Sequence, residues 1–142
     1  MINATAEYAL RAVVFLASNE SEYVSRGRLA RETKIPSDYL VRVLMSLDEA
    51  AVLTSQRGRR GGYRLNCKAN ELTVYDVIAA VTALPTIVKC PLGIEEHIDL
   101  CPLHARLNEV AEMAVAAYRA TSVAELLPKE CKAASGCAFP QS

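Results

Sequence analysis

The sequence predicts a mainly α-helical protein with a small β-hairpin wing, that is, a winged helix-turn-helix followed by a long C-terminal dimerisation helix. Two capped helical patterns separated by a tight turn occupy about residues 25–47. A glycine-punctuated basic turn follows between two short strand patterns, and a long helical seam begins at Pro102. With two Phe, six Tyr and no Trp, the chain has few aromatic residues for a β-sandwich, which favours packed helices.

The first two helices have clear start signals. Asn3 or Thr5 can cap a helix that runs to about Ser18, and apolar residues cover most of its circumference. We therefore expect several partners to bury this helix. After a polar loop, Ser25 caps a short helix that ends at about Thr33.

A turn at residues 34–36 leads to the third helix, because the residue before Pro36 is disfavoured in the helical region. We expect Ser37 to cap this helix. Its apolar residues recur at steps of three and four, which predicts one buried face: Leu40, Val43, Leu44 and Leu47. A helix, a tight turn and a capped helix over about 25 residues form the helix-turn-helix pattern.

Two short strands are expected next, at residues 52–56 and 62–66. The turn between them reads Arg-Gly-Arg-Arg-Gly, so the pair forms a β-hairpin with a basic tip. Thr73 then caps a fourth helix that continues to about Thr82.

The long C-terminal helix begins at Pro102, which suits the first helical position. Its residues at alternating four- and three-residue steps are typical of a seam for another helix, which predicts a homodimer: Leu103, Leu107, Val110, Ala114, Ala117 and Thr121. We divide the chain accordingly into a winged helix-turn-helix DNA-binding domain, a Cys/His sensor loop, the dimerisation helix and a flexible tail: 1–82, 83–101, 102–123 and 124–142.

The net charge of zero conceals a basic half and an acidic half. Residues 1–68 hold eleven Lys and Arg with seven Asp and Glu, whereas residues 69–142 hold five with nine. This asymmetry favours a polyanion-binding face in the first half. The first apolar stretch, 9–17, contains Arg11 and is too short to cross a bilayer, so we expect a cytoplasmic protein with no membrane partner.

The helix-turn-helix and the hairpin both carry candidate contacts to double-stranded DNA. The first turns of a recognition helix approach base edges, where Arg42 can bind guanine while Ser37 and Tyr39 reach phosphates. Arg26 and Arg28 on the preceding helix suit the DNA backbone. The hairpin adds four arginines: Arg57, Arg59, Arg60 and Arg64. An arginine at a glycine-rich tip can enter a narrow minor groove.

The same residues exclude the common catalytic arrangements. The Gly58-x-x-Gly61-Gly62 pattern is not followed by Lys-Ser or Lys-Thr, so it is not a phosphate-binding loop. There is no paired-carboxylate motif, and neither histidine has a nucleophile placed beside it. We therefore do not expect an enzyme.

A cysteine and histidine segment precedes the long helix. Cys90 and Cys101 flank a loop, and His104 follows three residues later. Thiolate and imidazole ligands suit an iron–sulfur cluster or zinc. The same thiols could act as a metal-free redox sensor or pack as small buried side chains. A small redox or metal-handling protein that does not act on DNA is the alternative from a different class.

Three motifs resemble the Rrf-type (IscR/NsrR/CymR) family of winged-helix transcription regulators: Tyr8-Ala9-Leu10-Arg11, Pro36-Ser37-x-Tyr39-Leu40 and Arg57-Gly58-x-x-Gly61-Gly62-Tyr63-x-Leu65. The resemblance covers about residues 2–123. It implies a winged helix, a long dimerisation helix and binding to imperfect palindromes, and we expect a repressor. Through the wing motif, Tyr63 joins the candidate DNA contacts.

The resemblance also implies a ligand set for a cluster that modulates DNA affinity. Cys90, Cys101 and His104 match the first Cys, the last Cys and the His of the family's cluster site, whereas the middle Cys is absent. The remaining ligand is either His97 or Glu7 of the partner subunit, whose position matches the family's acidic ligand. Such a set suits a 2Fe–2S cluster, with zinc as the alternative metal.

Two further positions depart from the family pattern. Ala50-Ala51-Val52 stands where the family has Ala-Gly-Leu, and the loss of that glycine is expected to strain the helix end. Val41-Arg42 stands where IscR-like members have Glu-Gln, so their target sequence does not carry over to this chain.

Overall fold

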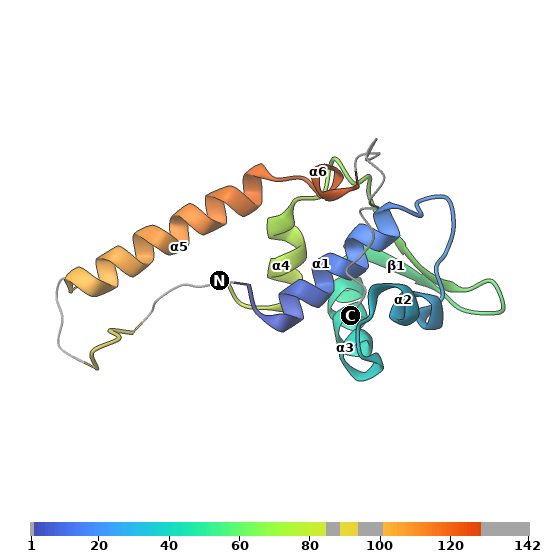
Figure 1. Cartoon of the computed structure of the whole chain (residues 1–142), viewed down its shortest axis with the longest axis horizontal. Coiled ribbons are helices and arrows are strands. Elements are labelled where there is room, and N and C mark those ends of the chain that lie inside the picture. The colour runs from blue at the N-terminus through green and yellow to red at the C-terminus, as the bar shows by residue number, and fades with distance from the viewer. Residues whose placement is uncertain (1, 85–88, 94–100, 129–142) are drawn as a thin grey trace, which may run out of the picture.

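The computed structural model describes residues 2–84, 89–93 and 101–128. Its elements, in chain order, are α1 (Ala4–Ala17), α2 (Arg26–Thr33), α3 (Ser37–Glu49), β1 (Leu53–Gln56), β2 (Gly62–Leu65), α4 (Val74–Val81), α5 (Pro102–Ala120) and α6 (Val123–Leu126). The described chain is mainly helical with one two-stranded hairpin (Figure 1), which confirms the predicted fold class.

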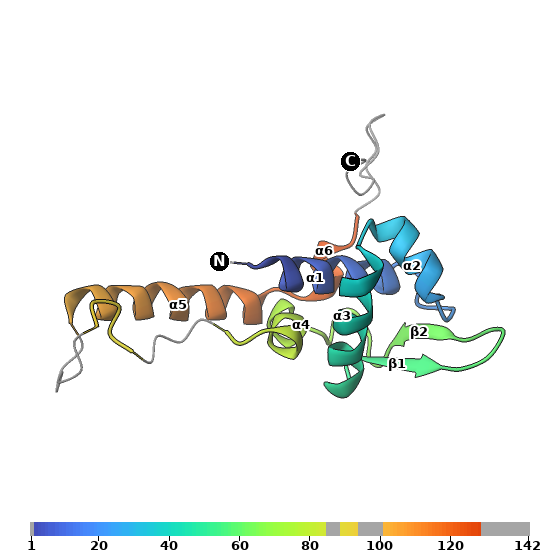
Figure 2. The same cartoon turned by 90° about the horizontal axis from the view of Figure 1, so that it is seen from below.

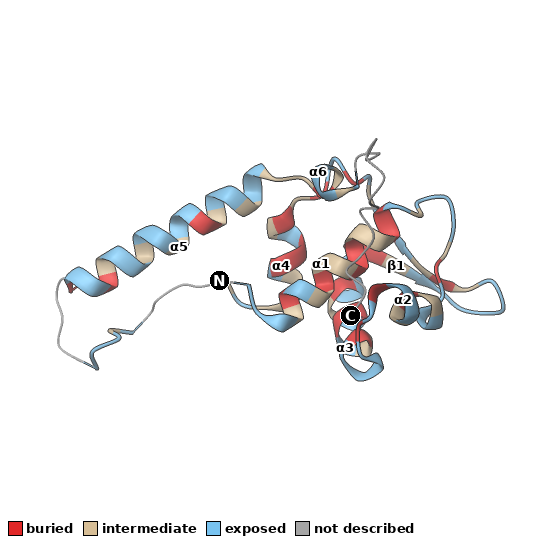
Figure 3. Cartoon of the chain, viewed as in Figure 1, coloured by how far each residue is buried: buried red, intermediate tan, exposed pale blue. Residues whose placement is uncertain are grey.

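Helix α1 is the centre of the core. It packs against α2, α3, α4, α6 and β2. Its buried residues are Ala6, Ala9, Ala12, Val13, Leu16 and Ala17. Figure 3 shows buried residues gathered on α1 and on the elements around it, whereas α5 is exposed along most of its length. The expected burial of the first helix by several partners is thus confirmed.

Three of the expected helix caps form. Asn3, not Thr5, caps α1 by accepting a hydrogen bond from the Ala6 N–H at 2.9 Å. Ser25 accepts from the Arg28 N–H at 3.3 Å at the start of α2. At α4, the Thr73 hydroxyl and the Asp76 carboxylate form a reciprocal capping box.

The expected cap at Ser37 is wrong. Helix α3 begins at Ser37 itself, and Pro36 takes the capping position with an extended backbone and no side-chain hydrogen bond. The Pro36 carbonyl accepts the first helical bond from Leu40 at 2.9 Å. Proline holds φ near the value that the capping position needs, so Pro36 takes that position and Ser37 becomes the first helical residue. Leu40, Val43, Leu44 and Leu47 form the buried face as predicted.

The end of α3 has the strain that the missing glycine predicts. Ala51 adopts a positive φ of 57°. Its N–H donates to Asp48, and the Val52 N–H donates to Leu47, both at 3.0 Å. These two bonds close the helix as a Schellman motif, which favours glycine at the left-handed position. Asn66 further holds this turn through a 3.0 Å bond to the Ala51 carbonyl.

The hairpin pairs Leu53 with Leu65 and Gln56 with Gly62 in an antiparallel register. A short bridge that local patterns do not signal adds Val24 beside β2, through two 2.9 Å backbone bonds with Tyr63. A Cβ at Gly62 would lie 2.3 Å from the Val24 carbonyl oxygen. Glycine is therefore required at this position for the wing to reach the body of the domain.

Helix α5 begins away from the domain and runs back toward it (Figure 1), and α6 then packs on the core. Figures 1 and 2 both show α5 extending from α6 to a far end on the side opposite the hairpin. The helix ends at Ala120, and Ser122 pairs with Thr73 in an isolated bridge. Val123 is then fully buried in the main core. The sequence division placed residue 123 in the long helix and a flexible tail after it. Instead, Val123, Ala124 and Leu127 pack on the core, because a Ser122–Glu125 capping box starts a new helix there.

Within the described residues, no helix is long and apolar enough to cross a lipid bilayer.

Candidate DNA-binding surface and cysteine pair

The tip of the hairpin is basic and exposed. Arg57, Arg59 and Arg60 all lie on its surface. Among the described residues, none of the three has a side-chain hydrogen bond or an ion pair, so their guanidinium groups are available to an external anion. Arg64 is exposed on β2, and its guanidinium carbon lies 4.8 Å from the ring centre of Tyr23. The half-buried Tyr63 is engaged in the backbone bridge to Val24.

The recognition-helix candidates lie on the open side of α3. Ser37, Tyr39 and Arg42 are exposed, while the buried side chains of the helix face the core: Leu40, Val43, Leu44 and Leu47. The Arg42 guanidinium carbon lies 5.5 Å from the centre of the Tyr39 ring. That ring contacts Tyr8 of α1 edge to face, with centres 5.7 Å apart. Nothing in the local sequence signals this contact, because it joins two helices about thirty positions apart.

The two arginines expected on α2 differ in their environment. Arg26 is exposed. Arg28 forms an ion pair with Glu22 and donates a 3.1 Å hydrogen bond to Asn19. Its guanidinium also lies over the Phe15 ring. Arg28 therefore holds the loop between α1 and α2, and Arg26 is the freer cation for a phosphate.

Cys90 and Cys101 are brought together at the start of α5. Their sulfur atoms lie 3.7 Å apart and are not joined in a disulfide. Two thiolates on one tetrahedral ion with metal–sulfur bonds of about 2.3 Å lie about 3.8 Å apart, so the pair fits two corners of such a site. Cys101 is buried and also caps α5, because its sulfur accepts the His104 N–H at 3.3 Å. The sequence indicated Pro102 as the first helical residue but not this capping role.

Among the described residues, the other expected ligands do not complete a metal site with the pair. Within ranges 2–84, 89–93 and 101–128, no three Cys, His, Asp or Glu side chains converge as a metal site. The buried His104 joins Cys101 through its backbone. Glu7 is exposed on α1 and forms an ion pair with Arg11 one turn later. His97 lies outside the described residues, as do Cys131 and Cys137.

Cys67 lies apart from this pair, in the loop after β2. It is half-buried against the main core. Burial raises the pKa of the Cys67 thiol, and the nearby carboxylates of Glu71 and Asp76 raise it further. This thiol is therefore less readily ionised than a free cysteine.

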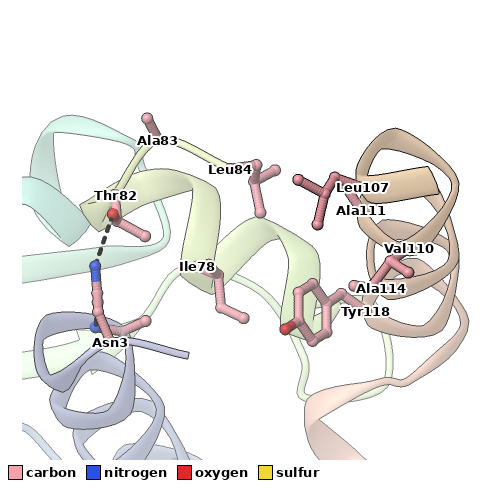
Figure 4. Close-up of a pocket in the computed structure, with 11 residues that line it drawn as sticks. Asn3, Ile78, Thr82, Ala83, Leu84, Leu107, Val110, Ala111, Ala114 and Tyr118 are labelled. Carbon is pink, nitrogen blue, oxygen red and sulfur yellow. Dashed lines mark hydrogen bonds between the residues drawn. The ribbon is translucent and has the colours of Figure 1, made fainter. Parts of the chain in front are cut away.

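An apolar groove of about 310 Å³ separates α5 from α4 and the start of α1. Figure 4 shows Ile78 and Leu84 facing a row of α5 side chains across this groove: Leu107, Val110, Ala111, Ala114 and Tyr118. A 3.0 Å hydrogen bond between Asn3 and Thr82 closes its other end. Val110 is 52% exposed and Met113 is 72% exposed, so α5 presents apolar residues that the described part of the chain does not cover.

Residues 2–129 match the Rrf2 family, which is described as iron-dependent transcriptional regulators. This chain belongs to the Rrf2 family. It is 31% identical over 118 residues to BadM of Rhodopseudomonas palustris, which carries the name of an HTH-type transcriptional regulator, covering 83% of this chain and 75% of BadM. It is 30% identical over 113 residues to the HTH-type transcriptional regulator NsrR of Bacillus licheniformis, covering 79% and 78% of the two chains.

The solved structure of T. potens IscR is similar in fold, with a TM-score of 0.79 over 96% of this Rrf2-family chain and 93% of the other, at 20% identity. Membership of the family confirms the resemblance that the three motifs indicate. The Rrf2 chain is a transcription regulator and not an enzyme. The alternative of a small redox or metal-handling protein that does not act on DNA is therefore set aside.

Proposed function

We propose that this Rrf2-family chain acts as a homodimeric repressor that binds an imperfect palindrome in double-stranded DNA. The observation that carries the proposal is the group of exposed arginines at the wing tip, Arg57, Arg59 and Arg60, beside a helix-turn-helix. Helix α3 would enter the major groove with Arg42 at base edges, while Ser37, Tyr39 and Arg26 contact the backbone. Such a regulator works in the cytoplasm, together with the chromosome.

Salt dependence tests the DNA contact. A duplex selected by the wild-type protein from a randomised pool serves as the probe. Because each neutralised phosphate contributes about −0.9 to the slope of log affinity with log salt, replacing all three wing-tip arginines by alanine should make that slope shallower by about 2–3. Arg57→Ala alone should weaken binding by about 1–3 kcal/mol if it contacts a groove. A folded triple variant with the wild-type slope would show that the hairpin does not meet DNA.

The homodimer is proposed from the exposed apolar residues of α5 and the groove beside it. A second copy of α5 would cover Val110 and Met113, which are the most exposed of these side chains near the middle of the helix. Two recognition helices related by a twofold axis require half-sites spaced by about one turn of DNA or a multiple of it. Sedimentation of a monomer at micromolar concentration, with and without duplex DNA, would contradict this assembly.

We further propose that an iron–sulfur cluster, 2Fe–2S in type, modulates the DNA affinity. The supporting observation is the 3.7 Å approach of the Cys90 and Cys101 sulfurs. His104 and either His97 or Glu7 of the partner subunit would complete the ligand set. When bound, the cluster supplies a redox- and oxygen-sensitive crosslink among these ligands. Cys101 is also the N-cap of α5, so a change at its sulfur acts directly on the first turn of the dimer helix.

The cluster is tested by anaerobic reconstitution with iron and sulfide, followed by iron and sulfide analysis and visible absorbance. Cys90→Ala and Cys101→Ala should lose the absorbance, whereas Cys67→Ala should keep it. Coupling of about 1–3 kcal/mol between this site and DNA would give a change of about 5–150-fold in DNA affinity. The proposal is falsified if reconstituted wild-type protein holds neither iron nor sulfide. Stoichiometric zinc on the same cysteines would keep the site and remove its redox chemistry.

A metal-free thiol switch is the second candidate, and the same sulfur separation favours it. The two thiols can form a disulfide when each loses a proton and an electron to a small disulfide oxidant such as oxidised glutathione, which leaves as two thiols. Mass spectrometry of the oxidised protein would then find Cys90 linked to Cys101. A disulfide that changes DNA affinity in protein without iron or zinc would support this candidate over the cluster.

A further inference from the structure

Four side chains form a continuous stack from the outer face of α1 to the recognition helix α3. The Arg11 guanidinium carbon lies 5.7 Å from the centre of the Tyr8 ring on the same helix. Tyr8 meets Tyr39 across the helix pair at 5.7 Å with an angle of 61° between the rings. Arg42 then lies over the Tyr39 ring at 5.5 Å. The order along the stack is therefore Arg11, Tyr8, Tyr39 and Arg42.

The two rings in the middle of this stack differ in their freedom to move. Tyr8 is half-buried and belongs to α1, the helix that the whole core holds in place. Tyr39 is 46% exposed on the surface of α3. An edge-to-face contact favours one orientation of the exposed ring, because the positive edge of one ring meets the negative face of the other. The fixed Tyr8 ring therefore limits the orientations of Tyr39.

The orientation of Tyr39 in turn affects Arg42. A guanidinium group is attracted to the face of a tyrosine ring, and the long arginine side chain otherwise samples many rotamers at a helix surface. Arg42 over Tyr39 is thus held in a restricted set of positions before DNA arrives. Because Arg42 is already restricted, its side chain loses less conformational entropy when the protein binds DNA, which increases affinity without an added contact.

We propose that Tyr8 is a positioning residue for DNA recognition, which acts through Tyr39 to orient Arg42. The inference rests on the proposed role of Arg42 at a base edge. In this role, Tyr8 makes α1 contribute to sequence discrimination, although α1 itself does not lie in the groove. Removal of the Tyr8 ring should reduce discrimination at the base pair that Arg42 reads by about two- to ten-fold, the range for one aromatic or cation–π contact.

A double-mutant cycle tests this role. The probe is the duplex selected from a randomised pool by the wild-type protein, together with variants in which each base pair is replaced in turn. The position read by Arg42 is the one at which wild-type protein loses affinity and Arg42→Ala does not. At that position, Tyr8→Leu should lose discrimination, while Tyr8→Phe, which keeps the ring, should match the wild type. In the Arg42→Ala background, Tyr8→Leu should have no further effect.

Folding is checked by thermal unfolding of each variant. Tyr8→Met provides a second ring-free variant if Tyr8→Leu does not fold. Tyr75→Leu is the matched control, because Tyr75 holds Arg119 at 4.2 Å between α4 and α5 and has no place in the stack. It should leave discrimination unchanged.

The outcomes separate the two proposals. Equal effects of Tyr8→Leu with and without Arg42 would overturn the positioning role and leave the DNA contact in place, as would unchanged discrimination in a folded Tyr8 variant. An Arg42→Ala variant that matches the wild type at every base pair would overturn both.

Discussion

The winged helix-turn-helix and the start of α5 differ in how much of their structure one chain supplies. In the first, α1 lies in a core to which α2, α3, α4, β2 and α6 all contribute, and the wing is tied to the body through Val24. At the start of α5, the chain brings together two sulfurs and buries Cys101 and His104, while apolar residues further along the helix stay exposed. The DNA-binding unit is complete within one chain, whereas the helix that follows Cys101 still presents a surface for a partner.

This difference makes the two regions sensitive to different changes. Substitutions in the DNA-binding unit should alter the free energy of unfolding at any protein concentration. Substitutions on the exposed face of α5 should alter assembly and depend on concentration.

Gly62→Ala should destabilise the protein most, by about 3 kcal/mol or more. The added Cβ would lie 2.3 Å from the Val24 carbonyl oxygen, so the bridge between Val24 and Tyr63 must open, with loss of its two hydrogen bonds. Urea unfolding measures the change. Gly27→Ala is the matched control, because a Cβ at Gly27, in the first turn of α2, meets no atom within 4 Å and alanine is favoured over glycine in a helix. Equal stability of the two variants would show that the wing is not held by Val24.

Val110→Glu should weaken the homodimer by about 100-fold or more, because a buried carboxylate without a partner costs several kcal/mol at an interface. Its effect on the unfolding of the isolated chain should be small, since Val110 is 52% exposed there. Sedimentation across a range of concentrations gives the dissociation constant. Glu112→Lys changes a charge on an exposed residue of the same helix and serves as control. An unchanged dimer in Val110→Glu would place the interface elsewhere.

Cys67 should react with iodoacetamide several-fold more slowly in the folded protein than in urea at pH 8. Burial and the carboxylates of Glu71 and Asp76 raise the pKa of this thiol, so a smaller fraction is thiolate, the reactive form. The folded rate should rise more steeply with pH than the unfolded rate and approach it once the pH exceeds the raised pKa. Mass spectrometry of the labelled peptides separates Cys67 from the other cysteines. Identical pH profiles in the two states would contradict a raised pKa.

Ala51→Gly should stabilise the protein by about 1 kcal/mol, the smallest effect of the four. Ala51 holds a φ of 57°, which a residue with a Cβ adopts at a cost that glycine does not have. Part of the gain is offset, since glycine also increases the entropy of the unfolded chain. Thermal unfolding and urea titration measure the net change, with Ala50→Gly as control at a neighbour whose φ is −81°. Destabilisation by Ala51→Gly would remove the strain assigned to this turn.

Local signals predicted much of the fold. The caps at Asn3, Ser25 and Thr73 and the first-turn proline at Pro102 depend on a few consecutive residues, and all four lie where the sequence placed them. The predicted cap at Ser37 was wrong because two adjacent residues, Pro36 and Ser37, both suit a helix start. A capping propensity alone does not decide between them.

Contacts between distant segments were not predictable in the same way. The Val24 bridge, the burial of Val123 and the approach of Tyr8 to Tyr39 each join segments tens of residues apart, and no local pattern marks the partner. For the candidate site, the spacing of Cys90 and Cys101 indicated a pair but not that Cys101 would also cap α5. The ligands beyond that pair stay predictions, since one lies outside the described residues and another requires a second subunit.

The return of α6 to the core affects the order in which the protein can be completed during synthesis. Val123 fills space among Ala69, Leu72 and α1, and Ala124 donates a 2.9 Å hydrogen bond to Ala69. A nascent chain therefore cannot finish packing its helix-turn-helix until about residue 127 has left the ribosome tunnel. By then α5 has already been made. A chain cut short within α5 also leaves the core of the helix-turn-helix unfilled, although every residue of α1 to α4 is present.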